Sequence, residues 1–235
     1  MITVLVSPAE LAGERLELAG PEHHHLFRVR RVRAGERLRL VDGQGGARWA
    51  VVEAVGRSAA TLLPAEAAPA LEPARRVELA VAPPKPERAS WLVEKATELG
   101  VAAIHFVATE RDPRQIGAGS LGRLRRVAAA ALAQAGGATL PRIDGVHPFS
   151  ALAGLAARLA ARAFLDPGAP PWEGFGEPQP LLLAIGPEGG WSDAERAALA
   201  AAGFRAVGLG ARVLRVETAA VAALALALAP RAAAR

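Results

Sequence analysis

The sequence predicts an α/β protein with a β-rich N-terminal part and a C-terminal part that alternates strands and helices. Short alternating segments follow one another over the first 64 residues, which is typical of a small barrel or sandwich. From Arg76 onward, apolar strands alternate with helical patterns, which is typical of a parallel sheet. The stretch 65–75 is rich in alanine and proline and has no period. It indicates a boundary, so we predict domains at 1–68 and 69–235.

The N-terminal part contains five segments with the apolar or alternating pattern of strands. They are residues 2–6, 14–18, 36–41, 47–55 and 59–63. A glycine-rich turn, Asp42 to Gly46, joins the third and fourth segments and predicts a hairpin.

A basic run lies between the second and third segments. Its candidates for nucleic-acid contact are His24, Arg28, Arg30, Arg31 and Arg33, with Arg37 and Arg39 just after. Arginine forks onto phosphates and stacks on bases, so the run favours RNA or DNA contact; a solvated arginine face is the alternative. The three adjacent histidines, 23–25, point in different directions and have no cysteine or acidic cluster beside them. We therefore predict no metal site.

The C-terminal part predicts strands at 77–82, 101–107, 163–165 and 181–185 and helices at 86–99, 121–135 and 148–160. The first helix has its apolar residues on one face, Pro86 in its first turn and Gly100 just after its end. The apolar run 219–229 predicts a buried helix and is too short to cross a bilayer, which takes ~20 residues.

The stretch Leu181 to Ala220 contains two strands that each run into a glycine turn, 186–190 and 208–210. Ligands bind outside the carboxyl ends of strands in open α/β sheets, so we expect these turns to form one small-molecule site. Ser192 and Glu195 form a capping box, which starts the next helix and explains part of the first turn.

Several known nucleotide and hydrolase motifs are absent from this stretch. The first turn lacks the Gly-Lys-Ser/Thr ending of a P-loop, and the second lacks the third glycine of the dinucleotide fingerprint. No Gly-x-Ser-x-Gly nucleophile elbow is present. Arg212 and Arg215, beside the second turn, suit an anionic substrate. Glu217 complements the dipole of the last helix or pairs with Arg215.

The amino-acid composition restricts the binding partners and the cellular compartment that we expect for this protein. The formal net charge is +5, with 28 basic residues of which two are lysines, which favours an anionic partner; a G+C-rich coding bias is the alternative. The chain has no cysteine, which excludes disulfides and thiolate zinc sites. No signal peptide or membrane span is evident, and we expect a cytoplasmic protein.

The chain resembles the knotted SPOUT-class RNA methyltransferases and, among them, the bacterial 16S ribosomal RNA (uracil-1498 N3) methyltransferase family. The matching pieces appear in family order: His24-His25-Leu26 with the arginine run and Asp42-Gly43, then 95–101, 109–111, Gln134 with 140–141, 185–190 and 209–219. The last two pieces are specific as a pair, whereas the others are individually weak. The chain departs from the family at its start (Met1-Ile2-Thr3), at Asp112 and at Gly137, which bears on RNA contact.

The resemblance implies a PUA-like RNA-binding β-barrel at 1–68, a SPOUT domain with a deep trefoil knot at 69–235, and a homodimer. It implies methylation of N3 of a uridine in 16S ribosomal RNA, on the assembled small subunit, with S-adenosylmethionine as the cofactor. The base would have to be unstacked to reach the site. The alternatives are a non-catalytic RNA-binding protein on the same scaffold and a nucleotide-dependent oxidoreductase with a degenerate fingerprint.

The resemblance also implies site residues. We expect Arg215, Glu217 and Glu188 to be catalytic, and His24, Arg28, Arg30, Arg31, Arg33, Lys95 and Arg111 to bind RNA. The expected cofactor-binding residues are Leu165, Asp166, Ile185, Gly186, Pro187, Gly189, Leu209, Gly210, Arg212, Leu214 and Thr218.

Overall fold

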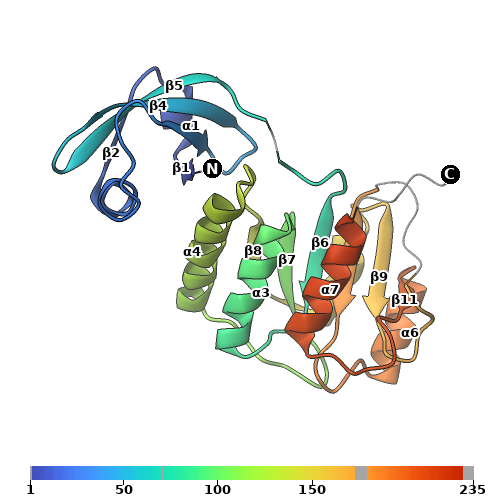
Figure 1. Cartoon of the computed structure of the whole chain (residues 1–235). Helices are drawn as coiled ribbons and strands as arrows, with labels where there is room; N and C mark the ends of the chain where they lie inside the picture. Colours follow the sequence, from blue (N-terminus) through green and yellow to red (C-terminus); the bar gives the residue numbers. More distant parts are fainter. Residues whose placement is uncertain (1, 70, 173–178, 230–235) are drawn as a thin grey trace. The chain divides into compact units, whose positions relative to one another are not determined.

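The structure is a computed structural model that describes residues 2–69, 71–172 and 179–229. It divides into two compact units (Figure 1). The first unit consists of Met1–Glu72 and Leu132–Leu140, and the second of Pro73–Ala131 and Pro141–Arg235. The segment Leu132–Leu140 therefore belongs to the N-terminal unit, which no local pattern indicated. The domain division at residue 68 stays a prediction.

The first unit is built on one five-stranded sheet with the order β1-β3-β4-β5-β2. Its strands are β1 (Thr3–Leu5), β2 (Leu16–Ala19), β3 (Arg37–Val41), β4 (Ala47–Val55) and β5 (Ala59–Ala67). β1 and β3 are parallel, and the other pairs are antiparallel. All five predicted strands are confirmed to within a few residues, and β5 extends into the stretch predicted as a linker.

The sequence pattern did not reveal three short helices of this unit. They are α1 (Pro8–Ala12), α2 (Gly20–His23) and a π-helix, η1 (His24–Val29). The basic run therefore starts as a helix that buries Leu26 and Phe27 against the sheet. His23 is buried, with Nε2 3.2 Å from the carbonyl oxygen of Gly56, while its neighbours His24 and His25 are exposed. The three rings thus face different surroundings, as adjacent residues on a helix must.

Arg39 corrects the predicted basic surface. Its side chain is only 1% exposed and donates to the carbonyl oxygens of Gly136 and, at 2.8 Å, Pro69. Burial lowers the pKa of its guanidinium, and the nearby Glu72 carboxylate opposes that shift. Arg39 therefore holds the segment Leu132–Leu140 to the first unit and is not available to nucleic acid.

The second unit is built on one six-stranded sheet with the order β11-β9-β10-β6-β7-β8, in which every neighbouring pair is parallel. The strands are β6 (Val77–Val81), β7 (Ala103–Ala108), β8 (Arg142–Pro148), β9 (Ala161–Leu165), β10 (Leu181–Ile185) and β11 (Arg205–Val207). This confirms the predicted parallel α/β sheet.

Helices cover both faces of this sheet. They are α3 (Pro86–Glu98), α4 (Ala118–Ala135), α5 (Leu152–Ala156), α6 (Asp193–Ala201) and α7 (Val216–Leu228). The end of α4, from Leu132 onward, is counted with the first unit. Alternate strand residues such as Leu79 and Leu183 pack against α3, α4 and α7, and α3 and α7 lie side by side (Figure 1). Ala80 and Leu182 pack on the other face, against α5 and α6. In the described residues no helix is both long and apolar enough to span a membrane.

One element prediction was wrong. We expected a helix at 148–160, but the chain forms strand β8 up to Pro148, then a 3₁₀ turn, η2 (Phe149–Ala151), and only a short helix, α5. β8 contains a glycine, charged residues and a terminal proline, and it lies at the edge of the sheet. Edge strands tolerate this composition, so their sequences show little of the apolar signal that marks a central strand.

Candidate functional site

Three neighbouring strand ends form the site. The glycine turn 186–190 follows β10, Leu165 and Asp166 end β9, and Gly208 to Gly210 follow β11. β9 lies between β10 and β11 in the sheet, so it separates the two glycine turns that were expected to meet directly. The site thus lies at the carboxyl edge of a parallel sheet, where open α/β folds bind ligands.

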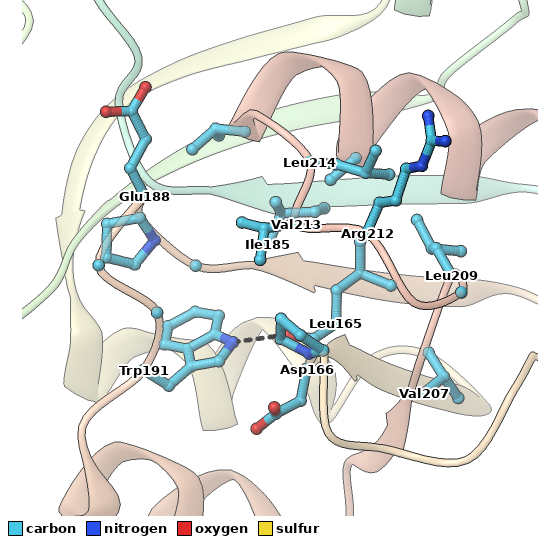
Figure 2. Close-up of a pocket in the computed structure, with 18 of the residues that line it drawn as sticks. Leu165, Asp166, Ile185, Glu188, Trp191, Val207, Leu209, Arg212, Val213 and Leu214 are labelled. Atoms are coloured by element: carbon cyan, nitrogen blue, oxygen red, sulfur yellow. Dashed lines mark hydrogen bonds between the residues drawn. The ribbon is translucent and has the colours of Figure 1, made fainter.

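A cavity of about 270 Å³ opens at this edge. Figure 2 shows Leu165, Ile185, Leu209, Val213 and Leu214 around it, from all three loops. Every predicted cofactor-binding residue except Thr218 lines it, as does Glu188. The remaining lining residues, which the prediction did not include, are Pro167, Gly190, Trp191, Arg196, Val207, Val213, Val216 and Ala219.

Trp191 organises two of the loops. Its side chain is buried, and its indole N–H donates to the carbonyl oxygen of Leu165 at 3.1 Å (Figure 2). A Cβ atom at Gly186 would lie only 2.8 Å from the indole ring, so the ring packs directly on the glycine backbone. The one sequence signal for this role is a tryptophan that directly precedes a helix-capping serine.

A second connection joins the β9 loop to α6. Arg196 Nε donates to Asp166 Oδ2 at 2.6 Å, and the Gly168 N–H donates to Asp166 Oδ1 at 3.1 Å. Burial by itself raises the pKa of Asp166, but these hydrogen bonds outweigh it and the pKa lies below its usual range. The carboxylate is therefore ionised and already paired, and it shapes the loop.

The predicted capping box is present at the start of α6. The Ser192 hydroxyl accepts from the Glu195 N–H, and Glu195 Oε2 accepts from the Ser192 N–H at 2.9 Å. Glu195 Oε1 also accepts from the Glu110 N–H at 2.9 Å, so this buried carboxylate links α6 to the loop after β7. Beside it, Arg111 donates to the carbonyl oxygen of Gly189.

The predicted catalytic residues come from two segments, Glu188 from the glycine turn after β10 and Arg215 and Glu217 from the start of α7. Arg215 is exposed at the N-cap of α7, and Glu217 is buried in the first turn of the same helix. Neither lines the cavity, although Val216 between them does. Arg88 Nη1 donates to Glu188 Oε1 at 3.2 Å and lies 3.5 Å from Glu217 Oε1. Arg88 was not among the predicted residues.

The predicted RNA-binding residues fall in both units. His24 and the four arginines between positions 28 and 33 are exposed in the first unit. Lys95 and Arg111 belong to the second, where Lys95 Nζ is paired with Glu94 at 2.7 Å and Glu98 at 2.8 Å. The structure therefore presents a basic surface on the first unit, while Lys95 has its charge neutralised locally.

One cluster outside the cavity has the spacing of metal ligands. His105, Asp144 and His147 have ligand atoms within 4.8 Å of one another. The two ring nitrogens of His105 lie 2.9 Å from Asp144 and 2.9 Å from Glu78, while Arg76 and Arg142 also contact these carboxylates. With these cations close by, the cluster is explained as a charge network inside the sheet.

Comparison with known proteins identifies the family. A model of the RNA methyltransferase domain matches residues 71–228, and a model of the RNA methyltransferase PUA domain matches residues 18–64. Ribosomal RNA small subunit methyltransferase E of Mycobacterium bovis is 36% identical over 87% of this chain and 82% of its own. The protein of that name from Synechocystis is 30% identical over 94% of this chain and 75% of its own.

The chain belongs to the ribosomal RNA small subunit methyltransferase E family. Solved structures agree with this assignment. That of the family member from Neisseria gonorrhoeae, bound to S-adenosylmethionine, covers 96% of both chains with a TM-score of 0.83 and 27% identity. A probable rRNA methyltransferase from Porphyromonas gingivalis gives a TM-score of 0.80 with 31% identity and 96% coverage of both chains.

The residues around the cavity fit S-adenosylmethionine, the family's cofactor. Apolar side chains such as Leu165 and Leu209 suit the faces of an adenine ring, and the glycine turns leave backbone groups open to its edge. Gly210 has a φ of +118. If it carried a Cβ atom, no neighbouring atom would lie within 4 Å of that atom, so a side chain there would project into open space.

Proposed function

We propose that this protein methylates N3 of a specific uridine in 16S ribosomal RNA, on the assembled small subunit. The observation that carries the proposal is the cavity at three strand ends, with Arg215 and Glu217 beside it, in a chain of this family. The curated relatives are named as small-subunit ribosomal RNA methyltransferases, which supports the substrate. We further propose that the C-terminal part is knotted, that two copies form a homodimer, and that it works in the cytoplasm.

The cavity residues divide into two roles in this proposal. Backbone groups of Leu209, Gly210 and Leu214 hold the adenine, and Ile185 and Gly186 line the opposite side. When bound, S-adenosylmethionine supplies a methyl group that its sulfonium has already activated. The protein's contribution is then mainly to position the base against this group.

The reacting base needs help because the imide nitrogen of uracil is a poor nucleophile while it carries its proton. In this proposal Arg215, which is exposed at the start of α7, stabilises the negative charge that develops on the uracil oxygens. In this proposal Glu217 or Glu188 receives or orients the proton. An Arg215→Ala variant should lose about 100-fold in turnover, since removal of one such donor typically costs that much. Full turnover in this variant would show that Arg215 has no catalytic role.

The direct test uses small ribosomal subunits from a strain that lacks this protein. They are incubated with the protein and methyl-labelled S-adenosylmethionine, and the labelled nucleotide is then mapped. We expect label at N3 of one uridine in 16S ribosomal RNA, and more on assembled subunits than on free RNA. Label only on a cytosine, or only on transfer RNA, would contradict the proposal. Calorimetry that shows no binding of S-adenosylmethionine would instead favour a non-catalytic RNA-binding protein.

A further inference from the structure

A second cavity, of about 160 Å³, opens at the carboxyl edge of the same sheet. It lies where two strands end, because Pro83 and Pro84 follow β6 and residues 114–116 belong to the loop after β7. The first two turns of α3 and of α4 complete its wall. It shares no lining residue with the cofactor cavity, so it is a separate site.

The two cavities lie next to each other along this edge. β6 is the neighbour of β10 in the sheet, so they open at adjacent strand ends. Arg88 belongs to the turn of α3 that borders the second cavity, and its Nη1 donates at 3.2 Å to Oε1 of Glu188, which lines the cofactor cavity. This pair therefore joins the walls of the two cavities, and a ligand as long as an RNA strand can reach both.

The floor of the second cavity is apolar and small. Four of its side chains are buried and one is half-buried, and they are Pro83, Pro84, Ala89, Leu124 and Ile116. Sites for drug-sized ligands typically measure ~300–1,000 Å³. At about 160 Å³ this cavity is too small for a second cofactor, but it has the size and the apolar surface to hold one planar base.

The rim of this cavity is positively charged. Arg123 lines it, is exposed, and has no hydrogen bond or ion pair within the part of the chain that the structure describes. Arg114 also lines it and is held in place by the buried Asp112, since Nε donates to Oδ1 at 2.7 Å and Nη2 donates to Oδ2. The N-terminal ends of α3 and α4 add the positive ends of two helix dipoles. The rim therefore favours an anionic group such as a phosphate.

We propose that this second cavity binds one further nucleotide of the RNA substrate, close in the strand to the nucleotide that is methylated. Its base lies on the apolar floor, and its phosphate lies against Arg123 with Arg114 beside it. Inorganic phosphate would leave the floor unused and an apolar ligand would leave the rim unused, whereas single-stranded RNA offers both groups together. This rests on the proposed function, since it requires RNA as the substrate, but it does not depend on which nucleotide is methylated.

A variant that fills the cavity tests the place of the base. Ser120 lines the cavity and is exposed on α4, so Ser120→Phe puts a ring into the space of the base without disturbing the core. Labelled methyl transfer should show a KM for small subunits raised by about tenfold, the usual effect of losing one stacked base. The kcat should stay within about twofold, because the lost contact binds the ground state and the transition state equally. The matched control is Ala130→Phe, at an exposed position of α4 that does not line the cavity, and it should keep the wild-type KM.

A charge variant tests the place of the phosphate. Arg123→Gln should make the slope of log affinity for small subunits against log salt shallower by about 0.7–1, since one phosphate contact is lost. Arg126→Gln removes the same charge three residues further along α4, from an exposed side chain that does not line the cavity, and should change the slope less. Every variant should keep the wild-type affinity for S-adenosylmethionine by calorimetry. Thermal melting checks that each is folded.

A photo-crosslink identifies the occupant directly. Gln115 is exposed and lines the cavity, so Gln115→p-benzoylphenylalanine places a photoreactive group at its rim. After irradiation with bound small subunits, we expect the cross-link on a nucleotide of 16S ribosomal RNA close in the strand to the methylated one.

Three outcomes would overturn the inference. These are equal KM values for Ser120→Phe and Ala130→Phe, equal salt slopes for Arg123→Gln and Arg126→Gln, or a cross-link only to a ribosomal protein. Each would leave the proposed function standing, because wild type would still transfer the methyl group. Transfer by wild type to a different RNA nucleotide would instead contradict the proposed function and leave this inference standing. Failure of wild type to methylate any RNA would sink both.

Discussion

Single residues of this site work by close contact, and Gly186 is the clearest case. Its backbone packs on the indole ring of Trp191, and that ring in turn fixes the carbonyl of Leu165. One glycine therefore sets the distance between two of the three loops around the cavity. The sequence predicted Gly186 only as part of a turn. Glycine is needed at this position because the ring of Trp191, five residues later, occupies the space that a side chain would take.

Gly186→Ala should accordingly weaken cofactor binding. The new Cβ atom would lie 2.8 Å from a buried ring that cannot move freely, so the loop has to shift. We expect a loss of at least about tenfold in S-adenosylmethionine affinity by calorimetry, and a destabilisation of about 1–3 kcal/mol by urea unfolding. Gly119→Ala is the control, since it lies in α4 with open space around its Cβ position and should keep affinity. Equal affinities in both variants would refute the packing argument.

Glu78 makes the stability of the folded protein depend on pH. Its hydrogen bond with His105 is the largest cause that lowers its pKa to about 2, and Arg76 adds to it against the effect of burial. Because the folded-state pKa lies below the ordinary value, this stabilisation is present above about pH 4.5 and is lost as the pH falls toward 2. Unfolding free energies from urea titrations should fall over this window in wild type. The fall should be smaller, by on the order of 2 kcal/mol, in Glu78→Gln. Parallel curves of unfolding free energy against pH for wild type and Glu78→Gln would contradict this role of Glu78.

At the scale of elements, the described part of the chain has two capping boxes that differ in burial. Ser7 and Glu10 cap the exposed helix α1, whereas Ser192 and Glu195 cap α6 in the interior. Glu195 additionally accepts from the Glu110 N–H, so it couples a helix start to a loop of another strand. The same local motif therefore contributes differently in the two places.

Two pairs of variants measure this difference. Ser192→Ala and Ser7→Ala should each cost about 1 kcal/mol, the usual value for a lost cap. Glu195→Ala should cost more, about 2–3 kcal/mol, because it leaves the buried Ser192 N–H and the partly buried Glu110 N–H without an acceptor. Glu10→Ala, in an exposed box, should cost under about 1 kcal/mol. Chemical unfolding gives these values, and equal costs for the two glutamates would show that burial has no effect here.

At the scale of the whole molecule, the basic charge and the cavity are separate properties of two units. The exposed arginines between positions 28 and 33 belong to the first unit and the cavity to the second. Because these residues belong to different units, RNA affinity and cofactor affinity should respond to different substitutions.

Arg31 adopts a left-handed conformation, φ 57, which is unusual for a residue other than glycine and bends the chain at the end of η1.

A variant with Arg30→Gln and Arg33→Gln tests this separation. Binding to small subunits should weaken, and the slope of log affinity against log salt should become shallower by about one to two, since two phosphate contacts are lost. Affinity for S-adenosylmethionine should stay at the wild-type value by calorimetry. Arg15→Gln with Arg158→Gln removes the same charge elsewhere and should change the slope less. Identical slopes in the two variants would mean that only net charge matters.

The sequence by itself determined the elements whose physics is local. Strand β10 is continuously apolar because both its faces are covered, and helix α3 has a single apolar face with a proline at its start. Both were therefore predicted within a residue of their observed bounds. The glycine turns and the capping box at Ser192 are also local signals, and they were sufficient to predict most of the residues that line the cavity.

Only the tertiary structure decided which of these pieces meet. The order β11-β9-β10 places Leu165 between the two glycine turns, and parallel pairing across that order is a long-range property that no window of sequence contains. For the same reason Arg88, 100 residues from Glu188 in the chain, could not be recognised as its partner. Arg39 could not be separated from its exposed neighbours, because whether a side chain is buried depends on segments that arrive from elsewhere in the fold.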